Sequence, residues 1–116
     1  AITSFRTAAS LSKAAYGAEA RYEIAHCLFI QNRYKDAEKA AFEVINKSGS
    51  YEFWVIKSYI LLGDLYHKQK DYFNAKATYR SVIDNAKIEE LRQEAELKLK
   101  QTTEEENKQS KVEESN

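Results

Sequence analysis

Apolar residues recur along most of the chain at the spacing of one face of an α-helix, and no stretch keeps the alternation of a half-buried strand. Polar or glycine-containing interruptions divide the pattern at residues 11–13, 31–34, 47–52 and 68–71. The predicted helices therefore cover about residues 15–30, 34–46, 53–68, 72–86 and 88–100, after an earlier helical face at residues 1–9. This pattern predicts an all-α fold.

The last segment, residues 102–116, has a different composition. Val112 is its single apolar residue. Such a segment buries too little apolar surface to offset the entropy lost on ordering. We expect a disordered or frayed polar tail, with a continuation of the last helix as the minor alternative.

The pattern also repeats. Residues 22–45 and 56–83 match at four positions, each 38 residues after its counterpart (34 to 72, for example). The matched pairs are Tyr34 and Tyr72, Ala37 and Ala75, Val44 and Val82, and Ile45 and Ile83. A repeat of this length is typical of two antiparallel helices joined by a tight turn, which stack on their neighbours as a solenoid.

The second unit resembles a specific family. The run Y-x2-L-G-x2-Y from Tyr59 to Tyr66, followed by Y-x2-A-x3-Y from Tyr72 to Tyr79, is similar to the tetratricopeptide repeat. The first full unit is a looser match, because Ala41 stands where the family has an aromatic residue. The resemblance implies the second helix of a truncated unit at residues 1–13, repeats at 14–50 and 51–87, and a capping helix at 88–101.

Spacing within the second unit predicts its core. Tyr59, Leu62, Gly63 and Tyr66 fall at i, i+3, i+4 and i+7, which is one stripe of a helix. We expect all four tyrosines from Tyr59 to Tyr79 in the core. Gly63 and Ala75 are expected to be small because two helix backbones pass close together. Cys27 is expected to be a small core residue.

The resemblance implies a non-catalytic scaffold that binds a peptide or partner domain on the concave face of the repeats. The implied binding residues are Glu19, Tyr22, His26, Phe29 and Ile30 in the first full unit and Lys57, Ile60, Asp64, His67 and Lys68 in the second. The alternative is that a neighbouring repeat or the capping helix covers them. The basic clamp with which some members bind C-terminal carboxylates is absent, since Tyr22, His26, Ile60 and Asp64 hold its places.

Other chemistry has little support in the sequence. His26 and His67 are the only histidines, too few for a metal centre without further ligands, and no cofactor motif occurs. With 18 basic and 18 acidic residues, the net charge favours neither nucleic acid nor an anionic membrane as a partner. No apolar run reaches the ~20 residues that span a bilayer.

The first residues and the run at residues 17–29 suggest that the chain belongs to a longer protein. The chain starts without Met and inside a helical pattern, so we expect an excerpt that forms the C-terminal part of a longer bacterial repeat protein. Ile2, Phe5 and Ala9 would then offer an open face, and the alternative function is a structural solenoid terminus or self-association through that face. The run "GAEARYEIAHCLF" is similar to bacterial cell-envelope members of the family, which implies a bacterial cell envelope or periplasm.

Overall fold

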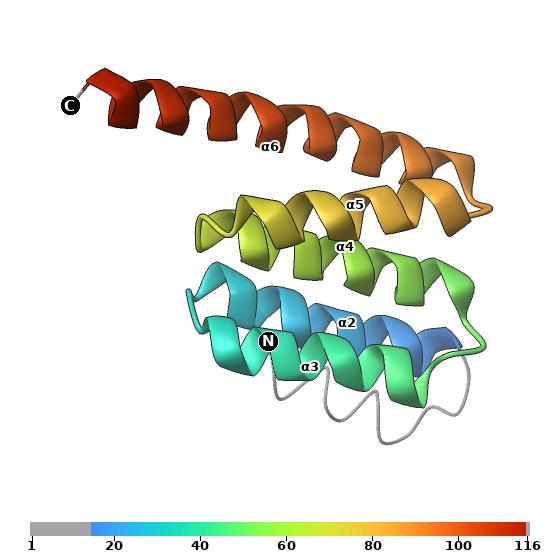
Figure 1. Ribbon diagram of the computed structural model, residues 1–116. Coiled ribbons are helices and arrows are strands. Elements are labelled where there is room, and N and C mark those ends of the chain that lie inside the picture. The colour runs from blue at the N-terminus through green and yellow to red at the C-terminus, as the bar shows by residue number, and fades with distance from the viewer. Residues whose placement is uncertain (1–14, 116) are drawn as a thin grey trace.

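The computed structural model describes residues 15–115, and Figure 1 shows them as a stack of helices. The helices are α2 (Ala15–Ile30), α3 (Tyr34–Lys47), α4 (Glu52–Lys68), α5 (Tyr72–Asn85) and α6 (Glu89–Ser115), and the described range contains no strand. The all-α prediction is confirmed. The helix expected at residues 1–13, with the face of Ile2, Phe5 and Ala9, lies outside the described residues.

The helices form antiparallel pairs. α2 packs on α3 and α4 packs on α5, while α6 runs along α5 as the last layer. α4 also packs against α2 on one side and α6 on the other. Each unit therefore contacts only its neighbours, which is the arrangement of a helical solenoid.

The turns inside the two pairs have the same backbone structure. Asn32 and Lys70 both have φ of 62°, in the left-handed region. In each turn the next residue donates its N–H to the carbonyl five positions earlier, Arg33 to Leu28 and Asp71 to Tyr66, both at 2.9 Å. These bonds satisfy carbonyls at the helix end that would otherwise lack a partner. The predicted repeat is thus present in the backbone as well as in the residue pattern.

Within residues 15–115 the core consists of two clusters that share α4. The first joins α2, α3 and α4 through Tyr22, Ala25, Leu28, Ala37, Ala41, Val44, Leu61, Leu62 and Leu65. The second joins α4, α5 and α6 through Ile56, Ile60, Ala75, Tyr79, Val82, Ala86, Leu91 and Ala95. α4 therefore packs on the first unit through one cluster, and on its partner α5 and on α6 through the other.

Gly63 leaves no room for a side chain, for a reason that differs from the expected one. A β-carbon at Gly63 would lie 2.5 Å from Cε1 of Tyr79 and 2.9 Å from its Cδ1 and Cζ. The ring of Tyr79, which is 1% exposed, occupies the space that a side chain would need. Gly63 is required by an aromatic ring that packs on α4 and not by the α5 backbone.

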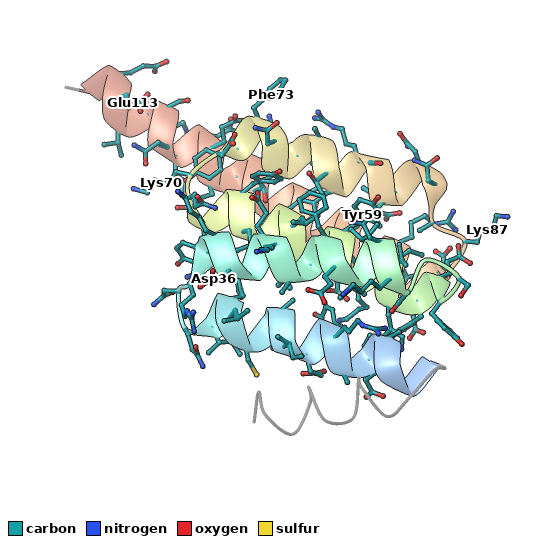
Figure 2. All side chains as sticks on the ribbon, turned by 90° about the horizontal axis from the view of Figure 1, so that it is seen from below. Asp36, Tyr59, Lys70, Phe73, Lys87 and Glu113 are labelled. Carbon is teal, nitrogen blue, oxygen red and sulfur yellow. The ribbon has the colours of Figure 1, made fainter. Side chains whose placement is uncertain are left out.

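Tyr59 is a second correction. Tyr79 and Tyr72 are buried and Tyr66 is half-buried, but Tyr59 is 40% exposed. Figure 2 places it on the surface near α3 and α5. Tyr59 belongs to neither core cluster, whose buried α4 members are Ile56, Ile60, Leu61, Leu62 and Leu65.

The end of the chain also differs from expectation. α6 does not stop near residue 101 and is helical through Ser115. Thr102 is fully buried, and Lys76 binds Glu106 with Nζ and Oε1 2.5 Å apart. The segment is ordered because it extends an existing helix and makes polar contacts with α4 and α5, without an apolar core of its own.

Candidate functional site

All ten implied binding residues lie on α2 and α4, the first helices of their pairs. The side of the molecule built from α2, α4 and α6 is called the first-helix face below. Because α4 packs between α2 and α6, this face is continuous across the three helices. Its aromatic part comes from α2 and from Trp54 of α4, and its charged part comes from α4 and α6.

The aromatic part is centred on Tyr22. His26 stacks on its ring at a centroid distance of 6.0 Å, and Trp54 packs against it at 5.5 Å. Lys57 holds its ammonium 5.5 Å from the centre of the same ring, a cation–π geometry. Burial, followed by the charge of Asp64, raises the pKa of the Tyr22 phenol. Tyr22 is therefore buried beneath His26, Trp54 and Lys57, and a partner would contact those side chains.

A network of charged side chains links α4 to α6. Asp64 accepts a hydrogen bond from the Tyr79 hydroxyl at 2.5 Å and from Lys98 Nζ at 2.7 Å. Glu94 lies 3.4 Å from Lys98 and 3.7 Å from Lys57. The four ionic side chains are between 21% and 31% exposed, so they are held in place yet still reach solvent. Burial, followed by the Asp64 carboxylate, raises the pKa of Tyr79.

At the C-terminal end of α4, His67 contacts α5 and α6. Its Nδ1 and the Thr102 Oγ1 are 2.7 Å apart and form a hydrogen bond whose donor depends on the histidine tautomer. The ring also meets Tyr72 edge-on, with centroids 5.7 Å apart. These contacts fix His67 as part of the junction between the last repeat and α6.

The structure separates the ten implied residues by exposure. Glu19, Ile30 and Lys68 are exposed, His26, Phe29, Lys57, Asp64 and His67 are half-buried, and Tyr22 and Ile60 are buried. Ile60 lies in the second core cluster with Leu91 and Ala95 of α6. The α4 members thus correspond to the alternative in which the capping helix covers part of the face. Their binding role stays a prediction.

Three residues of this face were missed from the sequence. Trp54 precedes Lys57 by one helical turn, and Glu94 and Lys98 are one turn apart on α6. Helical spacing from Lys57 would have pointed to Trp54. Nothing in the sequence pointed to Glu94 and Lys98, because α6 was interpreted only as a cap.

Further chemical groups are few in the described part of the chain. Residues 15–115 contain no group of three His, Cys, Asp or Glu side chains that could hold a metal ion. Cys27 is half-buried and unpaired by any disulfide within that range. No helix among the described residues is long and apolar enough to cross a membrane.

The fold and the face define a helical repeat protein made of paired helices. Comparison with protein families identifies the repeat: a family model described as Tetratricopeptide repeat matches residues 56–87, the α4–α5 pair. This segment is a tetratricopeptide repeat, as predicted. The search of curated proteins and the search of solved structures returned no match. The bacterial cell-envelope origin stays a prediction.

Proposed function

We propose that the chain is a non-catalytic protein-interaction module that binds a peptide or partner domain on the first-helix face. A tetratricopeptide repeat suggests a protein-interaction scaffold. The observation that carries the finer proposal is the accessible row His26, Phe29 and Ile30 on α2. Ile30 is 64% exposed although it is a large aliphatic residue.

The surroundings of this row favour binding of a short peptide. Trp54 and Lys57 both already pack on Tyr22, so little side-chain freedom is lost when a ligand arrives. Tryptophan and tyrosine are enriched among the residues that dominate the energy of protein interfaces. An apolar side chain of the partner would rest on Phe29 and Ile30.

The charged part of the face would orient the ligand. Lys57 and Lys98 stand beside Glu94 and Asp64, so both signs are present at fixed places. Polar groups of an extended peptide would find donors and acceptors there without a preference for a strongly charged partner. The favoured ligand is therefore a peptide with one apolar anchor and neighbouring polar groups.

Selection from a random peptide library displayed on phage, followed by fluorescence polarisation with selected peptides, tests the proposal. We expect Ile30→Ser and His26→Ala to weaken binding by about tenfold, the loss of roughly 1.4 kcal/mol. Phe73→Ser is the control, because Phe73 is 77% exposed and lies on α5, the second helix of its pair. If the selected peptides bind the Ile30→Ser variant with unchanged affinity and the Phe73→Ser variant more weakly, the binding surface lies on the second helices instead.

A further inference from the structure

The ion pair between Lys57 of α4 and Glu94 of α6 leaves hydrogen-bonding groups unused. Lys57 Nζ and Glu94 Oε1 are 3.7 Å apart, beyond the about 2.7–3.2 Å of an N–H···O hydrogen bond. Within residues 15–115 neither side chain makes a hydrogen bond. Lys57 otherwise contacts the Tyr22 ring, and Glu94 otherwise lies 3.4 Å from Lys98 Nζ. A free N–H donor therefore stands beside a free carboxylate acceptor, and both side chains are partly exposed.

The charges around this pair are balanced. Lys98, which lies next to Glu94, donates a hydrogen bond to Asp64 at 2.7 Å. The network thus has two cations, Lys57 and Lys98, and two anions, Asp64 and Glu94, with a net charge of zero (2 minus 2). A ligand carboxylate here would be attracted by Lys57 and repelled by Glu94, and an ammonium would meet the reverse. Charge complementarity favours a neutral group that both accepts and donates hydrogen bonds.

A primary carboxamide, the side-chain group of asparagine and glutamine, has this combination. Its carbonyl oxygen and its NH2 group share one carbon atom, so the oxygen can accept from Lys57 while an N–H donates to Glu94. A trans peptide bond directs its C=O and N–H to opposite sides, so one peptide unit can meet only one of the two. A hydroxyl would have to serve both with a single oxygen atom.

We propose that the pair of Lys57 and Glu94 recognises the carboxamide of an asparagine or glutamine in the peptide that binds the first-helix face. This inference rests on the function proposed above, and it names the polar group that accompanies the apolar anchor on Phe29 and Ile30. Glu94 is the specificity-determining residue, because its carboxylate accepts from the amide and repels the corresponding acid. Lys57 is held against the Tyr22 ring before the ligand binds, so its donor needs little ordering.

The peptides selected on phage test this assignment on the full chain. We expect asparagine or glutamine at a fixed distance from the apolar anchor in peptides that lose affinity with Ile30→Ser. Each such peptide is synthesised in three versions, with the amide residue, with the acid of the same length, and with leucine or methionine in its place. Fluorescence polarisation should show about tenfold weaker binding of the acid version and about fivefold weaker binding of the apolar version.

Glu94→Gln should abolish the preference for the amide over the acid. Its own side-chain amide donates to the acid and removes the repulsion, so the two versions should bind within about twofold of each other. Glu96→Gln is the matched control. It removes the same charge from α6, but Glu96 is exposed and lies two positions along the helix, on a different side from Glu94. This control should keep the tenfold preference, and circular dichroism melting of both variants checks that they fold.

The outcomes separate the two proposals. If no selected peptide depends on Ile30, the function proposed for the first-helix face fails, and this assignment fails with it. If peptides depend on Ile30 but bind equally well with the amide, the acid and the apolar residue, only the carboxamide assignment is overturned. An amide preference that survives Glu94→Gln, or that Glu96→Gln abolishes equally, would also overturn it, because the discrimination would then arise elsewhere or from the overall charge of α6.

Discussion

Gly63→Ala is the sharpest test of how the second helix pair is held together. On propensity alone the change would stabilise the protein by about 1 kcal/mol, because alanine is favoured over glycine inside a helix. The contact with Tyr79 acts in the opposite direction. The new β-carbon would lie 2.5 Å from Cε1, and ordinary contact begins at 3.4 Å, so the ring must retreat by about 0.9 Å (3.4 minus 2.5).

The ring of Tyr79 has little freedom to retreat. It is almost fully buried, and its hydroxyl donates to Asp64 at 2.5 Å. Overpacking of a filled core costs about 1–3 kcal/mol, and weakening a hydrogen bond to a charged group costs about 1.5–3 kcal/mol. After subtracting the gain in propensity, we expect Gly63→Ala to destabilise the chain by about 2 kcal/mol or more. In a domain of this size that lowers the Tm by about 8 °C.

Thermal unfolding followed by circular dichroism measures the effect, and two comparisons isolate its cause. Gly49→Ala is the control, since a β-carbon there meets only the Ile45 carbonyl oxygen, at 3.3 Å. In a Tyr79→Leu background the steric term is removed, so Gly63→Ala should become neutral or stabilising. Gly63→Leu should lower the Tm further than Gly63→Ala does. A Gly63→Ala variant that melts at or above the wild-type temperature, or that costs the same in both backgrounds, would refute the role assigned to the Tyr79 ring.

Three further predictions concern the junction with α6. Thr102→Val removes the hydroxyl bonded to His67 and should cost about 1 kcal/mol in urea unfolding; an unchanged midpoint would mean that this bond contributes nothing. Lys98→Met leaves Asp64 with one partner, and because both side chains are partly exposed we expect a loss of only about 1 kcal/mol, whereas a stabilised variant would contradict the pairing. Tyr79 has a folded-state pKa above its ordinary value of 10.0, so its stabilising contribution is complete below pH 10.0 and is lost as the pH rises further. Tyr79→Phe should therefore flatten the fall in unfolding free energy above pH 10.0, and an equal slope in both proteins would exclude this linkage.

The helices and their pairing could be predicted because their signals are local. The interruptions at residues 31–34 and 68–71 coincide with turns in which Asn32 and Lys70 take the same positive φ. The spacing of Ala37, Ala41 and Val44 corresponds to the buried side of α3. Periodicity of this kind depends on residues within one helix, so a single sequence carries it.

The accessible site was harder to predict because burial depends on the neighbouring helix. Ile60 and Lys57 lie three positions apart on α4, yet Ile60 is buried under α5 and α6 while Lys57 reaches solvent. The family resemblance identifies the helix and not the extent to which α6 covers it. Glu94 and Lys98 complete the face from α6, and no pattern on α4 could have indicated them.

The helical tail, residues 102–115, is stabilised by a contribution that apolar burial does not include. A segment with one apolar residue gains little from burial, and that consideration alone predicted disorder. Helix propagation, however, costs much less than nucleation, and residues 102–115 continue a helix that Leu91 and Ala95 already anchor in the core. The segment contains five glutamates and two lysines, both good helix formers, and Thr102 and Glu106 add contacts to α4 and α5. Order in this tail therefore arises because it continues the helix that ends the solenoid.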